Sequence, residues 1–165
     1  MVKLTTPLLI MALTVWAFTP AAAQNAGTKD EQFREMTALI ESGRYLFTVQ
    51  SVQPTGARTV HTTPGYTLEA SDSIFKAYLP YYGRSYQSGF GGDGGIEFEA
   101  SPENLTITVN EKKQMIQVQF EISGKNDKYD LYLSAGSSGY GSLSINSQNR
   151  QPISYSGTIG PLREE

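Results

Sequence analysis

The sequence predicts an α+β fold: a mainly antiparallel β meander of about eight or nine strands, barrel- or sandwich-like, with one N-terminal amphipathic helix. Two observations support this prediction. Beyond residue 44, apolar and polar side chains alternate with a period of two in segment after segment, which is typical of antiparallel sheets with one buried face and one wet face. Before residue 44, one stretch shows helical spacing instead.

The predicted helix begins with a capping-box pattern at Thr28 to Glu31, in which the Thr and Glu side chains satisfy free backbone N–H groups. Phe33, Met36 and Ile40 follow at helical spacing and are expected to pack on the core. Gly43 is a natural stop, because glycine tolerates the left-handed conformation that ends helices.

The predicted strands follow the helix in order, and most are marked by apolar residues two positions apart. Turns are expected at Pro54 to Gly56, at Pro64-Gly65, at Ser71-Asp72 and at the segment EKKQ. The segments expected to form strands are those of Tyr45, Phe47 and Val49; Tyr66 to Ala70; Ser73 to Leu79; Ile96, Phe98 and Ala100; Leu105, Ile107 and Val109; Ile116, Val118, Phe120 and Ile122; Tyr129, Leu131 and Leu133; Leu143 and Ile145; and Ile153 and Tyr155.

The first residues have the pattern of an export signal. Lys3 precedes an apolar run over 8–18, and small residues follow at Ala21 to Ala23. We therefore expect residues 1–23 to be a signal peptide cleaved near Ala23, and residues 24–165 to form a single β-rich domain in the periplasm or cell envelope. The apolar run is shorter than a bilayer requires, and the mature chain contains no candidate transmembrane segment.

Composition argues against several classes of partner and chemistry. The chain has 165 residues, no cysteine, and 13 Lys and Arg against 16 Asp and Glu. Thiol catalysis, disulfides and cysteine metal sites are thereby excluded. A nucleic acid would require clustered cations, which are missing, so we expect no nucleic-acid partner.

The segment Gly89 to Gly94 matches the pattern G-x-G-x-x-G of dinucleotide-binding proteins. That motif functions between a strand and a helix whose N-terminus faces the pyrophosphate. Here the following residues alternate as a strand, so we interpret the match as a loop and expect no cofactor.

An aromatic-rich segment is the candidate ligand-binding site. Exposed tyrosine rings beside an arginine could stack on a sugar or hold an extended peptide, so the possible partners are a glycan, a lipid or a peptide. The alternative is that these rings plug one end of the β-structure. The candidate residues are Tyr78, Tyr81, Tyr82, Arg84, Tyr86 and Phe90.

The sequence contains no recognisable catalytic or metal constellation. Glu97 and Glu99 share a face with each other and are expected to point to water, although with Asp93 they could serve a hydrolase. The single histidine, His61, is expected at an exposed strand edge. We predict no catalytic residues and no metal site.

Two segments, "YLPYYGRSY" and "NRQPISYSGTI", resemble the bacterial exported proteins grouped as domain of unknown function 4251. The family features fall on Leu79 to Ser85, Ile96 to Phe98, Arg150, and Tyr155 to Ile159. Tyr82 and Ser85 depart mildly from the family pattern, which has Phe and Ala there. The resemblance implies an envelope or periplasmic protein of a Gram-negative bacterium and implies no activity.

Two arginines, Arg84 and Arg150, lie in these two segments, and we expect them to be architectural, bonding carbonyls or a carboxylate. Our functional expectation is a non-enzymatic ligand-binding module. The alternatives are a structural or accessory envelope protein without a small ligand and a carboxylate-dependent hydrolase.

Overall fold

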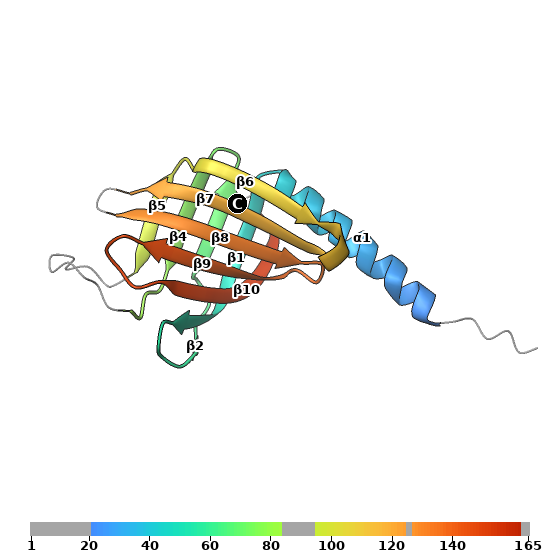
Figure 1. The fold of residues 1–165 in the computed structure, drawn as a ribbon, viewed down its shortest axis with the longest axis horizontal. Helices are drawn as coiled ribbons and strands as arrows, with labels where there is room; N and C mark the ends of the chain where they lie inside the picture. The colour runs from blue at the N-terminus through green and yellow to red at the C-terminus, as the bar shows by residue number, and fades with distance from the viewer. Residues whose placement is uncertain (1–20, 84–94, 125–126, 163–165) are drawn as a thin grey trace, which may run out of the picture.

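A computed structural model of the protein describes residues 21–83, 95–124 and 127–162 (Figure 1). A helix, α1 (Ala21–Glu41), precedes all the strands. The described strands are β1 (Arg44–Pro54), β2 (Val60–His61), β3 (Thr67–Ser71), β4 (Ile74–Leu79), β5 (Ile96–Ala100), β6 (Glu103–Asn110), β7 (Met115–Ser123), β8 (Lys128–Gly136), β9 (Tyr140–Ser147) and β10 (Ile153–Pro161), with a 3-10 turn, η1 (Glu111–Lys113), between β6 and β7.

The strands form one antiparallel sheet in the order β5-β4-β3-β1-β10-β9-β8-β7-β6, and the short β2 pairs with β1. The predicted α+β class and antiparallel meander are confirmed, and the nine strands of this order agree with the predicted eight or nine, while the short β2 is an additional strand. Strands β5 and β6 are consecutive in the chain yet lie at opposite edges of the sheet. The sheet therefore curls back on itself, and β6 to β9 cross in front of β3, β4 and β5 (Figure 1).

The core fills the space between these two layers. The rings of Phe75 on β4 and Phe120 on β7 lie 4.4 Å apart, and those of Phe98 on β5 and Tyr129 on β8 lie 5.8 Å apart. Such ring pairs join strands that are distant in the sheet order, which holds the curl closed. The inward-facing apolar residues predicted in β1, β7, β8, β9 and β10 are buried.

Strand β6 departs from the predicted alternation. Leu105 and Ile107 were expected on a buried face, but they are 44% and 36% exposed. The reason is position: β6 is the last strand of the sheet, with β7 on one side only among the described residues. An edge strand lies where the opposite layer no longer covers it fully.

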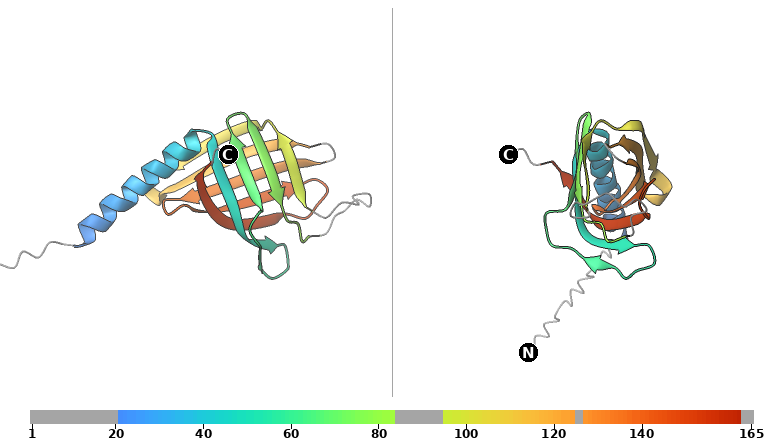
Figure 2. Two further views of the ribbon diagram at one scale, coloured as in Figure 1. Left: turned by 180° about the vertical axis from the view of Figure 1, so that it is seen from behind. Right: turned by 90° about the vertical axis from the view of Figure 1, so that its left-hand side faces the viewer.

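Helix α1 covers one end of the space between the layers, as the end-on view shows (Figure 2). Phe33 and Ile40 are buried against the core, and the helix ends before Gly43, whose φ of 70° is left-handed as predicted. The predicted start at Thr28 is wrong, because the helix already begins at Ala21. The alanines at 21–23 and at 26 have high helix propensity, and they extend the helix before the capping-box pattern.

Strand β2 is not among the segments predicted as strands, because Val60 and His61 show no clear alternation, although His61 was expected at a strand edge. It pairs with Ser51 and Val52 of β1, and both its residues are exposed. His61 thus lies on an exposed strand, as expected. No described helix is long and apolar enough to cross a membrane.

Candidate functional site

The structure places three of the predicted ligand-binding residues in different settings. Tyr78 points outward from β4, is 51% exposed, and stacks on Tyr66 with ring centroids 5.4 Å apart. Tyr82 is 49% exposed just beyond the end of β4. Tyr81 is half-buried, and its hydroxyl donates a hydrogen bond to the carbonyl of Gln151 at 3.2 Å.

The other three predicted residues, Arg84, Tyr86 and Phe90, lie outside the described residues, as do Asp93 and the Gly89 to Gly94 match. The role of the aromatic-rich segment as a whole therefore stays a prediction. For the part of the segment that the structure describes, Tyr81 contributes to the packing of the β-structure.

Arg150, in the turn between β9 and β10, holds the described part of the aromatic-rich segment against that turn. Its Nη1 donates to the carbonyl of Gly95 at 2.8 Å, and its guanidinium lies 5.1 Å from the centre of the Tyr81 ring. Beside it, the buried hydroxyl of Tyr155 donates to the carbonyl of Pro80 at 2.9 Å. These contacts agree with the architectural role expected for Arg150, whereas Arg84 lies outside the described residues.

A different surface gathers polar side chains from five neighbouring strands. The pairing registers align outward-facing residues of β6, β7, β8, β9 and β10 into two rows that run across the strands, which we call the polar rows. The first polar row is Thr106, Gln119, Tyr132, Ser144 and Ser154, and the second is Thr108, Gln117, Ser134, Ser142 and Ser156.

The polar rows arise from strand periodicity. Each strand contributes two uncharged polar residues at positions i and i+2, which necessarily share a face. The antiparallel registers then bring these pairs directly opposite one another. Since adjacent strands lie about 4.8 Å apart, a five-strand row spans roughly 19 Å.

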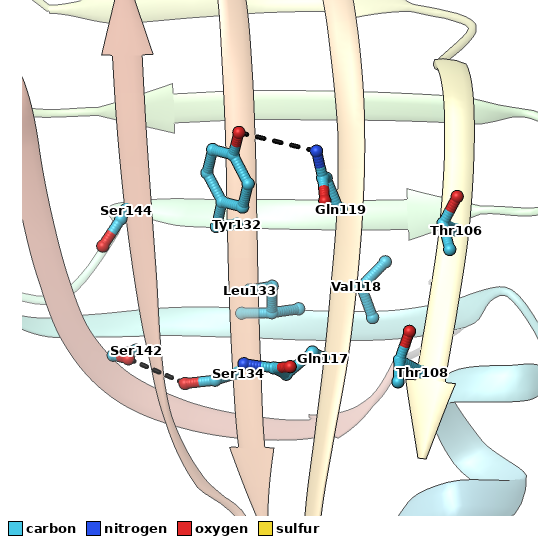
Figure 3. Close-up of a pocket in the computed structure, with 10 residues that line it drawn as sticks. All are labelled: Thr106, Thr108, Gln117, Val118, Gln119, Tyr132, Leu133, Ser134, Ser142 and Ser144. Carbon is cyan, nitrogen blue, oxygen red and sulfur yellow. Dashed lines mark hydrogen bonds between the residues drawn. The ribbon is translucent and has the colours of Figure 1, made fainter. Parts of the chain in front are cut away.

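Eight of the ten residues of the polar rows line a shallow groove of about 420 Å³, shown in Figure 3. The floor is formed by Val118 and Leu133, which also pack into the core. Among the described residues that line the groove, Tyr132 alone is aromatic, and it is 41% exposed.

Hydrogen bonds within the polar rows orient some of the side chains while their hydroxyl and amide groups stay at the surface. The hydroxyls of Ser134 and Ser142 lie 2.8 Å apart, and those of Ser144 and Ser154 lie 3.0 Å apart. The side-chain amide of Gln119 donates to the Tyr132 hydroxyl at 3.5 Å.

The polar rows carry no charged residue, in contrast with the outer face of the other layer. There Glu69, Lys76 and Glu99 lie directly opposite one another on β3, β4 and β5, and the Lys76–Glu99 pair is 3.7 Å apart. Exposed positions of a sheet commonly hold such charges. The face of the polar rows is therefore chemically distinct, because its ten neighbouring outward positions hold no charged residue.

Charged residues resume beside the first polar row. Glu121 of β7 forms an ion pair with Lys128 of β8 at 2.6 Å. The hydrogen bond from Lys128, and after it the one from Asn104, lowers the pKa of Glu121. The same Lys128–Glu121 hydrogen bond raises the pKa of Lys128. Both groups therefore stay charged at neutral pH, and they mark where the uncharged surface ends on this side.

The polar rows themselves contain no carboxylate and no histidine. Glu97 and Glu99 are exposed, as expected, and no cluster of three or more His, Asp or Glu capable of holding a metal occurs in the described ranges.

Comparison with known proteins places this architecture in a family. The sequence matches the family described as "Domain of unknown function (DUF4251)" over residues 28–159. The chain belongs to the DUF4251 family. The predicted family resemblance is thereby confirmed.

A solved structure has the same fold as this DUF4251 chain. The crystal structure of a DUF4251 family protein from Bacteroides eggerthii is similar with a TM-score of 0.64 and 15% sequence identity. The match covers 80% of this chain and 89% of that chain. No curated protein matches the sequence significantly.

Sequence reasoning missed the polar rows of this DUF4251 chain. Each i, i+2 pair was visible, for example Gln117 and Gln119 or Ser142 and Ser144, but was interpreted only as the wet face of a strand. The missing information was the register of four strand pairs, which aligns the five pairs into one surface.

Proposed function

We propose that this DUF4251 protein is an exported, non-enzymatic binding module whose ligand is a neutral, hydroxyl-rich chain, such as an oligosaccharide, lying along the polar rows. The observation that carries the proposal is the alignment of ten uncharged polar residues across five strands. Such a surface offers a repeated pattern of hydrogen-bonding groups along one direction, which suits a chain with a repeated pattern of hydroxyls.

The side-chain chemistry supports a neutral ligand. Hydroxyls of Ser and Thr both donate and accept hydrogen bonds, and the amides of Gln117 and Gln119 do the same through separate atoms. Sugar hydroxyls need this dual capacity. A phosphate or carboxylate ligand would instead favour Arg or Lys, and the polar rows contain neither.

Tyr132 supplies the aromatic contact that such a ligand would use. Its ring is exposed at the centre of the first polar row, between Gln119 and Ser144. A tyrosine ring gives a flat apolar surface with a polar tip, which fits a sugar ring with an apolar face and polar edges. We propose a binding rather than a catalytic role because the polar rows themselves contain no carboxylate, histidine or lysine.

The aromatic-rich segment remains the competing surface. The stacked rings of Tyr66 and Tyr78 lie on the outer face of the other layer, with Glu97 directly opposite Tyr78. Exposed rings beside a carboxylate also suit a glycan, so the binding experiment includes this surface as a separate arm.

Binding is tested with an array of neutral and acidic glycans, followed by calorimetry on the neutral oligosaccharide that binds best. We expect Tyr132→Ala and Gln119→Ala each to weaken binding about fivefold or more, since a lost hydrogen bond or ring contact costs about 1 kcal/mol. The matched control is Tyr140→Ala, which removes a 62% exposed tyrosine of β9 outside the polar rows, and it should bind as the parent does.

Three outcomes would contradict the proposal. The protein could bind no neutral glycan on the array, as a purely structural envelope protein would. Folded Tyr132→Ala and Gln119→Ala variants could bind as tightly as the parent. Binding could instead be lost in Tyr78→Ala or Tyr82→Ala, which would assign it to the aromatic-rich segment.

Export is the second part of the proposal and rests on the pattern of Lys3, the apolar run 8–18 and Ala21 to Ala23. We expect the full-length chain, expressed in a Gram-negative host, to be recovered from the periplasmic or envelope fraction with Gln24 as its first residue. Intact-mass measurement checks this. A protein that stays in the cytoplasm with Met1 in place would contradict it.

A further inference from the structure

The free edge of β6 has the features of a pairing surface. Strand β6 is the last strand of the sheet and bonds to β7 on one side only among the described residues. Seven of its eight residues are exposed, including the apolar Leu105 and Ile107. An open edge presents unpaired N–H and C=O groups, which another strand can bond.

The two edges of the sheet differ in how they are protected. The opposite edge strand, β5, carries exposed carboxylates at Glu97 and Glu99, and charged side chains discourage pairing at an edge. The residues Leu105 to Val109 of β6 include no charge, proline or glycine. Of the two end strands of the described sheet, β6 is therefore better suited than β5 to accept another strand.

We propose that β6 pairs antiparallel with β6 of a second copy of this chain, forming a two-fold symmetric dimer. The sequence of β6 is complementary to itself in this arrangement. With Ile107 opposite its own equivalent, Thr106 lies opposite Thr108, and Leu105 lies opposite Val109. Apolar residues then meet apolar residues on the core side, and threonines meet threonines on the other side.

The one charged residue of β6, Glu103, lies at an end of the strand. Glu103 is separated from the regular β6–β7 ladder by an irregularity before Thr106, and Asn104 there has a left-handed φ of 53°. The regular part of the strand therefore stops short of Glu103. In this register Glu103 falls opposite Glu111 of the second copy, beyond the Leu105–Val109 pair, so these like charges lie outside the paired segment, within which they would be destabilising.

The dimer would extend the binding surface, a consequence that rests on the proposed function. An antiparallel pair around a two-fold axis perpendicular to the sheet keeps the same faces on the same side. Thr106 and Thr108 end the two polar rows at the β6 edge. Each polar row would continue into a row of the second copy and cross ten strands, or roughly 43 Å at 4.8 Å spacing.

Sedimentation and cross-linking test the dimer without any ligand, so failure of the dimer is distinguishable from failure of glycan binding. The parent protein should show a concentration-dependent monomer–dimer equilibrium. Ile107→Lys places two ammonium groups opposite each other and should be monomeric. The matched control, Ile74→Lys on the outer face of β4, changes an isoleucine of similar exposure, 39% against 36%, and should dimerise as the parent does.

The chain has no cysteine, so one introduced thiol reports the register directly. Directly opposite residues of an antiparallel pair have Cβ atoms about 4.5–5.5 Å apart, close to disulfide reach. Under mild oxidation, Ile107→Cys should give a covalent dimer in high yield, whereas Ile74→Cys should not. A parent that is monomeric at every concentration, or equal cross-linking of the two cysteine variants, would overturn the proposal.

Discussion

Replacing Gly157 with alanine should destabilise the fold by more than about 3 kcal/mol, because β1 and β10 approach each other too closely there for a side chain. A Cβ at Gly157 would overlap the backbone carbonyl of Thr48 and lie 3.2 Å from the Phe47 ring. A backbone atom cannot move aside as a flexible side chain can. The close approach occurs where the register of β1 shifts between Val49 and Ser51.

Gly160→Ala is the matched control on the same strand, because a Cβ there would meet nothing within 4 Å. It should leave stability unchanged within about 0.5 kcal/mol or raise it slightly. Urea unfolding of both variants provides the measurement. A Gly157→Ala protein as stable as Gly160→Ala would show that β1 and β10 do not approach as closely as described.

Stability should fall steeply above about pH 10 because of two buried tyrosines. Burial raises the pKa of Tyr45 and of Tyr155 well above the ordinary value of 10.0. Above pH 10 the unfolded chain releases these protons while the folded chain keeps them, so the unfolded state binds fewer protons. Each tyrosine then removes about 1.4 kcal/mol of stability per pH unit, or about 5 kcal/mol for the pair by pH 12.

Phenylalanine variants separate the two tyrosines. The Tyr45 hydroxyl has no hydrogen-bond partner among the described residues, so Tyr45→Phe should be neutral or stabilising at pH 7. Tyr155→Phe removes the bond to the Pro80 carbonyl and should cost about 1 kcal/mol at pH 7. Each variant should reduce the alkaline loss, measured by urea unfolding from pH 7 to pH 12, and the double variant should reduce it further. An unchanged loss in the double variant would contradict the assignment.

The alternation of single strands was enough to predict most of the core. Ile116, Val118, Phe120 and Ile122 are all buried on β7 as their spacing indicated, and Gly43 ends the helix as predicted. These features depend on the period of one strand or the last turn of one helix, and such local rules are legible in a single sequence.

Features that depend on how strands are ordered could not be predicted in the same way. The exposure of Leu105 and Ile107 follows from β6 being an edge, and the sequence does not state which strand is last. The close approach at Gly157 likewise requires knowing that β10 pairs with β1, about 100 residues earlier in the chain.

The candidate site shows the same difference between features set by local sequence and features set by the order of the strands. The tyrosines of 78–82 stood out in the sequence as a local cluster, yet the structure uses Tyr81 in packing and pairs Tyr78 with Tyr66. The polar rows, by contrast, are assembled from five short pairs of common residues. None of these pairs is unusual alone, and their chemistry emerges only when the registers align them.

An NMR titration would locate the ligand. Isotope-labelled protein is titrated with the neutral oligosaccharide that binds best, and the backbone amide shifts are mapped on the fold. The largest changes should fall on the outward residues of β6 to β10, centred on Gln119, Tyr132 and Ser134. Changes confined to the surface of Tyr66, Tyr78 and Tyr82, with β6 to β10 unaffected, would contradict the assignment of binding to the polar rows.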